Sequence, residues 1–403
     1  MDRLSPRLRD LLTNLAVSAV SVFVFLLICE LLVFRVILPS GSTPDNAYID
    51  DVVRYEPGQT GTWRVRNEIA APYAINAQGW NSGLDGYSEA RTPGVPRIAV
   101  VGDSYVEALQ VPPDASMAER LSETLYVAAD QPGEVYRFGM SGAPLSQYVH
   151  MARHEVADYK PDWLVVLLIH NDFDESFRFQ AGRYASSFLK FDVDNGQVVG
   201  EIAPQPLRPS PYGWFRNFAT LRFLVYRWQV RPDVILANLF SSSPTDAPAE
   251  PTAEPYDAAT QPADVPPAEP EPAPEFAANV NLTELLTVRS DVEAATSYGF
   301  EQLQRAATDM GANLLLVMDG DRRSLREGNK NGPALVLNEM AAREADKLGI
   351  AFLDLQPVFS ADWDAHQQRF EHDVDNHWNA YGHEVAARAV ADHIRQHTNQ
   401  QSD

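Results

Sequence analysis

Several polar positions in this sequence carry the residue types that nucleophilic catalysis requires. Ser104 follows an apolar run, and His377 stands near the end of the chain with Asp373 and Asp375 close before it. A serine hydroxyl becomes a good nucleophile when a neighbouring base takes its proton, and a carboxylate fixes the tautomer of an imidazole base. A glycine and an asparagine that follow two further apolar runs supply N–H donors for a developing oxyanion. These residue types together predict acyl transfer through a serine.

Strands that alternate with helices would bring these residues together. Five short apolar runs are typical of buried parallel strands, at 97–102, 135–139, 162–170, 313–319 and 349–355. Helical patterns lie between them, at 116–129, 298–310 and 334–348. The alternation predicts an α/β fold with three layers, α/β/α, around a mainly parallel sheet. Ligands of such sheets gather beyond the carboxyl ends of the strands, and Ser104 follows directly after one of them.

The polar positions resemble the motifs of the SGNH (GDSL-type) hydrolase superfamily and occur in that family's order. The nucleophile block matches Gly102-Asp103-Ser104, and the next three blocks match Gly142, Asn171 and His377. The resemblance runs from about residue 97 to residue 395. In addition, the stretch 73–82, YAINAQGWNS, resembles the lead-in of membrane-anchored members linked to bacterial surface polysaccharides.

The resemblance implies a role for each matched residue. Ser104 would be the nucleophile and His377 the general base. The oxyanion hole would consist of the backbone N–H groups of Ser104 and Gly142 and the side-chain amide of Asn171. The family's fold is the SGNH or flavodoxin-like form of the α/β/α sandwich, and its chemistry needs neither a metal ion nor an organic cofactor.

Two positions depart from the family's pattern. His170 stands where the third block often has a glycine, and Val374 stands where the catalytic carboxylate usually lies, three residues before the histidine. We choose Asp375 as the triad acid, because D-x-H-W-N occurs in membrane-anchored relatives. Asp373 is the alternative.

Other polar clusters have structural interpretations. The spacings of His372, His377 and His383 do not place them on one helical face, so no metal site is predicted. The acidic stretch 172–175 is expected to be a solvated loop. The basic stretch 319–332 lacks the glycine spacing of a phosphate-binding loop and is expected to be exposed.

The N-terminal region predicts a membrane anchor. Residues 11–29 contain no charged side chain, and as a helix they would span roughly 28 Å, close to the thickness of a bilayer's hydrocarbon core. A cleaved signal peptide is the alternative, but the apolar run continues to residue 34 without a small-residue cleavage site. Arginines precede the segment and aspartates follow it, so we expect the N-terminus in the cytoplasm. The sequence predicts a single-pass inner (cytoplasmic) membrane protein with a periplasmic or extracellular catalytic domain.

The expected domain organisation follows from these segments. It comprises a cytoplasmic tail at 1–10, a transmembrane anchor at 11–38, an exported lead-in at 39–96 and an SGNH-type domain at 97–403. Residues 242–276 are rich in proline and acidic residues and have no Lys or Arg, so we expect a disordered insertion in that domain. An inter-domain linker is the alternative.

Composition narrows the functional classes. The net charge of −23 argues against a nucleic-acid partner, since phosphate binding needs a basic surface. The single cysteine, Cys29, excludes an intramolecular disulfide. We expect a membrane-anchored serine esterase that acts on an ester or an acylated saccharide. An O-acyltransferase that modifies a cell-envelope or secreted polysaccharide is the first alternative, with polysaccharide-biosynthesis proteins as possible partners. A non-catalytic polysaccharide-binding or assembly protein on a hydrolase scaffold is the second.

Overall fold

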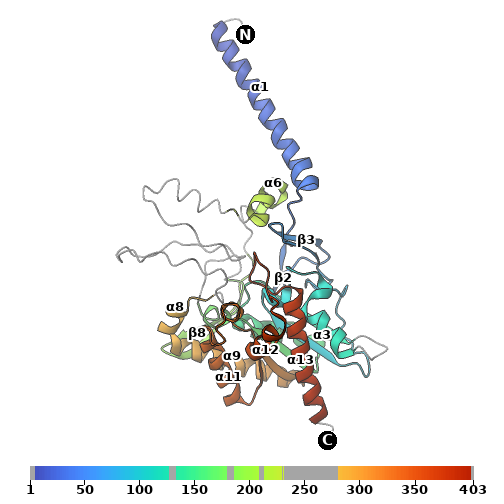
Figure 1. Ribbon diagram of the computed structural model, residues 1–403, viewed down its shortest axis with the longest axis vertical. Coiled ribbons are helices and arrows are strands. Elements are labelled where there is room, and N and C mark those ends of the chain that lie inside the picture. Colours follow the sequence, from blue (N-terminus) through green and yellow to red (C-terminus); the bar gives the residue numbers. More distant parts are fainter. Residues whose placement is uncertain are drawn as a thin grey trace. The chain divides into compact units, whose positions relative to one another are not determined.

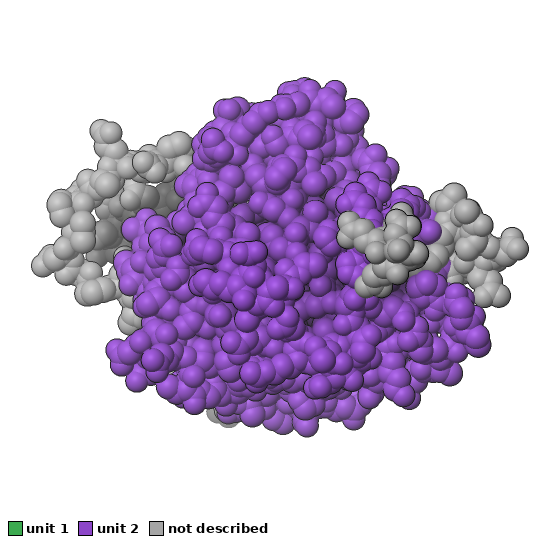
Figure 2. All heavy atoms as spheres, turned by 90° about the horizontal axis from the view of Figure 1, so that it is seen from below, with its two compact units in different colours: residues 1–42, 64–67, 209–245 green, residues 43–63, 68–208, 246–403 purple. Residues whose placement is uncertain are grey.

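The computed structural model describes residues 5–126, 133–178, 186–207, 213–228, 230 and 280–400. The chain divides into two units. Unit 1 comprises residues 1–42, 64–67 and 209–245, and unit 2 comprises residues 43–63, 68–208 and 246–403; Figure 2 shows one face of unit 2. The predicted insertion at 242–276 lies outside the described residues, as do residues 1–4 of the predicted tail.

Unit 1 contains a long apolar helix. Helix α1 (Pro6–Ile28) continues directly into η1 (Cys29–Ile37), a π-helical segment. Residues Arg7–Ile37, here called the anchor, are long and apolar enough to cross a membrane, and no other helix in the described part of the chain meets that test. The helix begins four residues before the predicted 11–38 and ends one residue before its end, and its role as a membrane anchor stays a prediction.

Three short helical segments from much later in the chain also belong to unit 1. They are η4 (Gly213–Asn217), α6 (Ala219–Arg222) and η5 (Phe223–Arg227). Figure 1 shows α6 beside the end of the anchor that leads into the rest of the chain.

Unit 2 is built on a five-stranded sheet with the order β11-β10-β7-β5-β6. Its strands are β5 (Arg97–Gly102), β6 (Glu134–Gly139), β7 (Trp163–Leu168), β10 (Asn313–Met318) and β11 (Ala351–Asp354). All neighbouring strands are parallel. The mainly parallel sheet predicted from the five apolar runs is therefore confirmed. The chain passes from β5 to β6 on one side and then to β7 on the other, which makes β5 the point where the strand order reverses.

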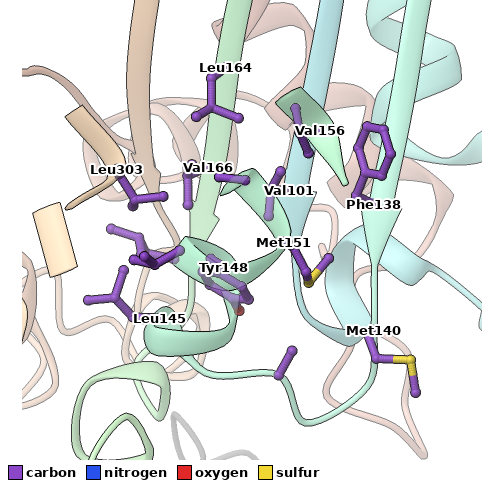
Figure 3. Packing of buried hydrophobic residues seen from close by; sticks show 14 of the residues in the cluster. Val101, Phe138, Met140, Leu145, Tyr148, Met151, Val156, Leu164, Val166 and Leu303 are labelled. Carbon is purple, nitrogen blue, oxygen red and sulfur yellow. The ribbon is translucent and has the colours of Figure 1, made fainter. Parts of the chain in front are cut away.

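Helices cover both faces of this sheet. One face packs against α4 (Leu145–His154), α9 (Arg289–Met310) and α11 (Leu335–Leu348), and the other packs against α3 (Met117–Tyr126), α12 (Leu355–His366) and α13 (Ala380–Gln400). Because successive side chains of a strand point to opposite faces, Val101 belongs to the first core and Val100 to the second. Figure 3 shows Val101 and Phe138 packed with Tyr148 and Met151 of α4. The predicted three-layer α/β/α architecture is confirmed.

The chain also forms three two-stranded sheets within the described residues. The sequence analysis did not predict them. They are β1 (Asn46–Ile49) with β2 (Val52–Tyr55), β3 (Thr60–Val65) with β4 (Ile69–Ala74), and β8 (Lys190–Asp194) with β9 (Gln197–Ile202). The remaining short helices are α2 (Ser104–Glu107), η2 (Pro113–Ala115), η3 (Val156–Tyr159), α5 (Asp172–Glu175), α8 (Leu282–Thr287) and α10 (Arg322–Arg326). The strands β1 and β2 are only four residues long, and β2 is buried throughout, so neither carries a clear two-residue alternation.

Candidate active site

The turn after β5 presents Ser104 at the reversal point of the sheet. Ser104 is the first residue of α2, and Asp103 caps this helix by accepting a hydrogen bond from the backbone N–H of Tyr105 at 2.9 Å. In open α/β sheets, such a reversal leaves a crevice beyond the strand ends where ligands bind. Local capping therefore places the half-buried Ser104 at the edge of the sheet where such folds bind ligands.

Two glycines allow the chain to fold this tightly. A Cβ on Gly102 would clash with the Val106 side chain, and a Cβ on Gly139 would collide with the backbone of Glu107. Gly102 and Gly139 are paired at the ends of β5 and β6. Since neither position has room for a side chain, the helix that carries Ser104 lies directly against both strand ends.

His377 joins Ser104 to a carboxylate. Its Nε2 lies 2.7 Å from Ser104 Oγ, and its Nδ1 is hydrogen-bonded to Asp375 Oδ1. The backbone N–H of His377 also donates to Asp375 Oδ1, at 2.9 Å. Asp375 and His377 are both buried, whereas Ser104 is half-buried. The structure thus brings together a serine, a histidine and an aspartate in the order that nucleophilic catalysis requires.

The structure separates the two aspartates that the sequence left as alternatives. The Asp375 side chain is 3% exposed and contacts His377, whereas the Asp373 side chain is 70% exposed and pairs with Arg369. A two-residue spacing suffices for Asp375 because its carboxylate closes an Asx turn onto the backbone N–H of His377. Asp373 is not brought to the histidine.

The histidine and its carboxylate shift each other's pKa. Burial lowers the pKa of His377, but the charge and hydrogen bond of Asp375 outweigh it, so the pKa is raised above its usual 6.5. Burial raises the pKa of Asp375, but attraction to His377 outweighs it and the pKa falls below 3.8. Asp375 therefore carries its charge at neutral pH and favours the protonated form of His377.

Gly142 and Asn171 lie at the same edge of the sheet as Ser104. Gly142 follows β6 in a turn with a φ of 70°, and Asn171 follows β7 at the start of α5. Since β5, β6 and β7 are parallel neighbours, the segments after them emerge beside one another. The Asn171 Oδ1 atom is buried and has no hydrogen-bond partner within the described part of the chain.

The lead-in segment supports the helix that carries Ser104. Asn81 donates from Nδ2 to the backbone carbonyl of Glu107 at 2.8 Å. The Glu107 carboxylate accepts hydrogen bonds from the hydroxyl groups of Tyr55 and Ser141. Ser141 is therefore engaged with Glu107 in this structure.

The segment after β7 differs from its sequence-based expectation. Asp172 is fully buried, with Oδ2 accepting a hydrogen bond from the backbone N–H of Ile169 at 2.7 Å, so a solvated loop is wrong for this residue. Burial raises its pKa. His170, at the position that is often glycine, is buried with Nε2 3.0 Å from Asn338 Oδ1. Burial lowers the pKa of His170 to about 4, so it is neutral at physiological pH.

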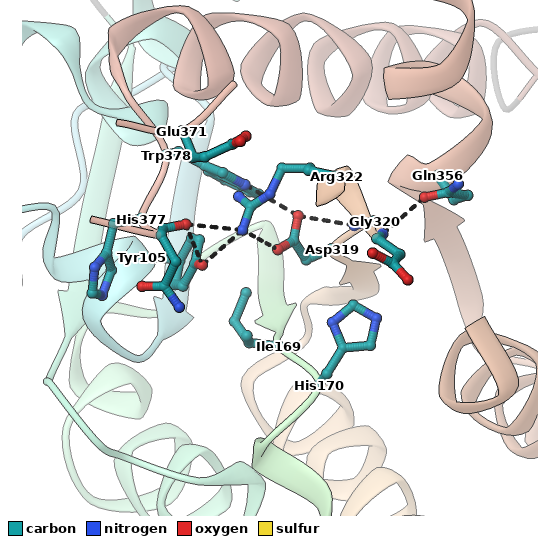
Figure 4. Close-up of polar contacts among 12 residues, drawn as sticks. Tyr105, Ile169, His170, Asp319, Gly320, Arg322, Gln356, Glu371, His377 and Trp378 are labelled. Carbon is teal, nitrogen blue, oxygen red and sulfur yellow. Dashed lines mark hydrogen bonds and ion pairs between the residues drawn. The ribbon is translucent and has the colours of Figure 1, made fainter. Parts of the chain in front are cut away.

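A buried ionic network holds the loop that carries His377, and the sequence analysis missed it. Arg322 donates to the Tyr105 hydroxyl at 2.8 Å and to the backbone carbonyl of Asn376 at 3.0 Å, and it pairs with Asp319 at 3.2 Å. The indole N–H of Trp378 donates to the same aspartate at 3.1 Å. Figure 4 shows these contacts beside His377. The prediction of an exposed loop is therefore wrong for the start of 319–332. The position of this stretch at the carboxyl end of β10, where site residues gather, could have indicated its role.

A pocket with a volume of about 420 Å³ lies next to the histidine loop. Its lining includes Glu68, Gln110, His372 and Tyr381. Gln110 Oε1 and His372 Nε2 are buried and have no hydrogen-bond partner within the described residues. The lining also includes apolar residues, among them Ile69, Val111 and Pro112. Elsewhere among the described residues, no group of three or more His, Cys, Asp or Glu side chains is arranged to hold a metal ion.

A family model identifies the C-terminal part of this unit. The family is described as "SGNH hydrolase-like domain, acetyltransferase AlgX", and its model matches residues 283–403, which include His377 and Asp375. The match covers the segment with Asp375 and His377 and does not include Ser104, Gly142 or Asn171. No curated protein matches the chain.

Several solved structures resemble this chain at low sequence identity. A lipase/acylhydrolase from Enterococcus faecalis is 11% identical, with 75% of this chain and 96% of that chain covered and a TM-score of 0.37. LAE5, an alpha/beta hydrolase from the metagenome of Lake Arreo, Spain, is 13% identical, with the same coverage and TM-score. A catalytic mutant of Axe2, an acetylxylan esterase from Geobacillus stearothermophilus, is 12% identical, with 75% and 94% covered and a TM-score of 0.35.

Proposed function

We propose that the SGNH domain transfers an acyl group from an ester through a covalent intermediate on Ser104. The observation that carries this proposal is the 2.7 Å distance between Ser104 Oγ and His377 Nε2, with Asp375 bonded to the other ring nitrogen. This arrangement supplies a nucleophile, a base and a carboxylate that orients the base.

The reaction would proceed in two halves. His377 takes the proton of Ser104 as Oγ attacks the ester carbonyl, and the oxyanion receives hydrogen bonds from the N–H groups of Ser104 and Gly142 and from the Asn171 amide. The intermediate collapses when His377 protonates the leaving alcohol, which leaves an acyl ester on Ser104. A second hydroxyl compound then loses its proton to His377 and attacks the acyl ester; the bond from the acyl carbon to Ser104 Oγ breaks, and His377 returns the proton to Ser104 Oγ. Each oxyanion donor is typically worth about 2.7–4 kcal/mol of barrier.

The second hydroxyl compound decides the reaction class. Water makes the protein an esterase, which is the simplest outcome of this geometry. A sugar hydroxyl makes it an O-acyltransferase. One observation favours the transferase as the second candidate: the family whose model matches residues 283–403 is described as an acetyltransferase. An acylated saccharide is accordingly the substrate class we propose to test.

The anchor supports a location at a membrane. We propose a single-pass protein of the inner (cytoplasmic) membrane with a cytoplasmic N-terminus and with unit 2 on the other side, in a periplasm or outside the cell. Arginines before the anchor and aspartates after it support this orientation. In that location, polysaccharide-biosynthesis proteins are the partners we propose.

The test uses the full chain in detergent with p-nitrophenyl acetate as the acyl donor. We expect wild-type turnover and loss of at least about 10³-fold in Ser104→Ala and His377→Ala. A fluorophosphonate should label wild type on the peptide that contains Ser104, rather than on the one that contains Ser141. Added oligosaccharide acceptors that gain an acetyl group, detected by mass spectrometry, would identify the transferase.

A second outcome would contradict the proposed acyl transfer. A folded wild-type chain that neither turns over the ester nor reacts with the fluorophosphonate would overturn the acyl-enzyme. The non-catalytic polysaccharide-binding scaffold would then be the remaining hypothesis, and binding of the same oligosaccharides would test it.

A further inference from the structure

Residues 213–228, here called the aromatic segment, expose apolar side chains to an unusual extent. The exposed members are Trp214, Phe215, Phe218, Leu224, Val225 and Trp228. The largest are Trp214, which is 55% exposed, and Trp228, which is 44% exposed. Beyond the anchor, the exposed Trp and Phe side chains of the described part of the chain all belong to this segment. The ring centroid of Trp214 lies 3.8 Å from that of Phe215 and 5.7 Å from that of Phe218, so these three exposed side chains form an apolar patch, and such patches mark interaction surfaces.

The first part of the aromatic segment is bonded to the anchor. The Glu30 carboxylate accepts hydrogen bonds from the backbone N–H groups of Ala219 and Thr220, at 2.8 and 3.0 Å, and from the Thr220 hydroxyl at 3.0 Å. Arg35 donates to Glu30 at 2.9 Å and to the backbone carbonyl of Asn217 at 3.2 Å. These contacts fix the segment at the level of the anchor's last turns.

The second part is bonded to the chain that leaves the anchor. Arg227 donates to the carbonyl of Pro39 and to the Asn67 side chain, both at 2.8 Å. Arg222 donates to the carbonyl of Gly41 at 3.1 Å. A ring contact between Phe34 and Phe223, with centroids 4.4 Å apart, joins the two elements. Arg222 and Arg227 therefore point toward residues 39–41 and 64–67 of unit 1, while Trp214 and Trp228 remain exposed.

The charges in the anchor indicate the depth of these contacts. Residues 11–28 carry no charge, and at about 1.5 Å per residue they account for about 27 Å, nearly the whole hydrocarbon core. Glu30 and Arg35 then lie where the core gives way to the interface. Charged residues in such segments are costly unless paired, and these two are paired with each other and with the aromatic segment.

We propose that the aromatic segment lies on the membrane, in the interface at which the anchor ends. Trp is enriched at membrane interfaces, and short amphipathic elements bury an apolar face among lipid headgroups there. The aromatic segment has that composition and is bonded to the anchor at that level. The proposal rests on the membrane location given above and does not depend on the reaction at Ser104.

Site-directed spin labelling of the full chain in phospholipid vesicles tests this proposal. In a Cys29→Ser background, single labels replace Trp214 and Trp228 in the segment, Val20 in the anchor, and Val199 in unit 2. Val20 and Val199 are matched, with exposed fractions of 61% and 62%. We expect labels at Trp214 and Trp228 to collide with oxygen more than with a water-soluble nickel chelate, as at Val20, and the reverse at Val199.

Each other result contradicts a specific claim. Labels at Trp214 and Trp228 that behave like Val199, while Val20 lies in the bilayer, overturn the interfacial segment and leave the anchor intact. A Val20 label that collides more with the nickel chelate than with oxygen contradicts both the membrane-spanning anchor and the interfacial position of the aromatic segment. If Trp214→Cys fails to fold by circular dichroism, Leu224→Cys provides the same measurement. Ester turnover is not used, so failure of the proposed reaction is distinguishable.

Discussion

The nucleophile turn and the histidine loop form two halves of the same site, yet they are built differently. The backbone turn at 102–105 is set locally, because Asp103 caps α2 and Gly102 leaves room for the packing of that helix, although Glu107 at the end of the helix is bonded to more distant residues. The loop at 371–379 depends on residues far away in the chain. Arg322 and Tyr105 both donate to the carbonyl of Asn376.

This difference separates what a short motif encodes from what the whole fold must supply. The turn's geometry follows from local capping and strand pairing, so a tripeptide identifies it. The loop's position depends on a buried arginine that no part of the family's motifs includes. Changes in the two regions should therefore have different kinetic signatures.

The largest loss of kcat is expected from a change at Asp375, which is bonded to His377. Asp375→Asn keeps the shape but removes the charge that orients and stabilises the imidazolium, so kcat should fall on the order of 10⁴-fold. The matched control is Asp373→Asn, whose side chain is exposed, and it should stay within about twofold of wild type. Steady-state kinetics with p-nitrophenyl acetate measure both. Equal losses in the two variants would contradict the assignment of Asp375.

The next effect concerns the support of the loop. Arg322→Lys retains a cation beside Asp319 but loses the Nη2 atom that donates to both Tyr105 and Asn376, so His377 should be misplaced relative to Ser104. A small misplacement can cost about 10²-fold, and we expect that loss in kcat with little change in KM.

The neighbouring Arg323 provides the control for this change. Its exposed pair with Glu327 lies on the surface of α10, and Arg323→Lys should leave both kinetic constants unchanged. A loss of thermal stability in Arg322→Lys with normal kcat would show that the network supports the fold alone.

The pH dependence provides a smaller and graded effect. Because the pKa of His377 is raised above 6.5, kcat/KM should fall tenfold for each pH unit below that raised pKa, as the base becomes protonated. In Asp375→Asn the partner that raises the pKa is gone while burial remains, so the acidic limb of the residual activity should move to lower pH. A limb at the same pH in both proteins would contradict the coupling.

The smallest effect on rate is expected at Trp378. Its side chain is fully buried and donates to Asp319, which keeps its contacts with Arg322 and the N–H of Gly320 in Trp378→Phe. We expect a loss of about 2 kcal/mol of unfolding free energy and a change in kcat within about threefold. Thermal melts with parallel kinetics measure both; an unchanged melting temperature would contradict the role of this hydrogen bond.

The sequence predicted those features whose cause is local. The runs that form β5 and β10 were predicted at the observed residues except for one residue past the end of β10, because a buried strand is continuously apolar and ends at a glycine or a polar residue. The family resemblance selected Ser104 and His377 before the structure brought them within hydrogen-bond distance. Asp373 remained an alternative to Asp375 as the triad acid, because the direction of a side chain in a loop depends on turn geometry.

The features that sequence reasoning missed depend on long-range contacts. The burial of Arg322 requires Asp319 and Tyr105, and Tyr105 lies more than 200 positions away. Likewise, the sequence shows Glu30 only as a charged residue after an apolar run. Its hydrogen-bond partner Thr220 lies 190 positions further along the chain. No local pattern reports such pairings, since they exist only once the sheet and the anchor have folded.

The Asx turn at the histidine has a mechanical consequence. Asp375 is bonded to both the backbone and the ring of His377, so the acid and the base form one rigid body. Of the contacts that link these three residues, the hydrogen bond between His377 and Ser104 is the one that joins separate segments of the chain. Any displacement of the loop during turnover would lengthen or shorten that one hydrogen bond and leave the carboxylate–imidazole pair unchanged.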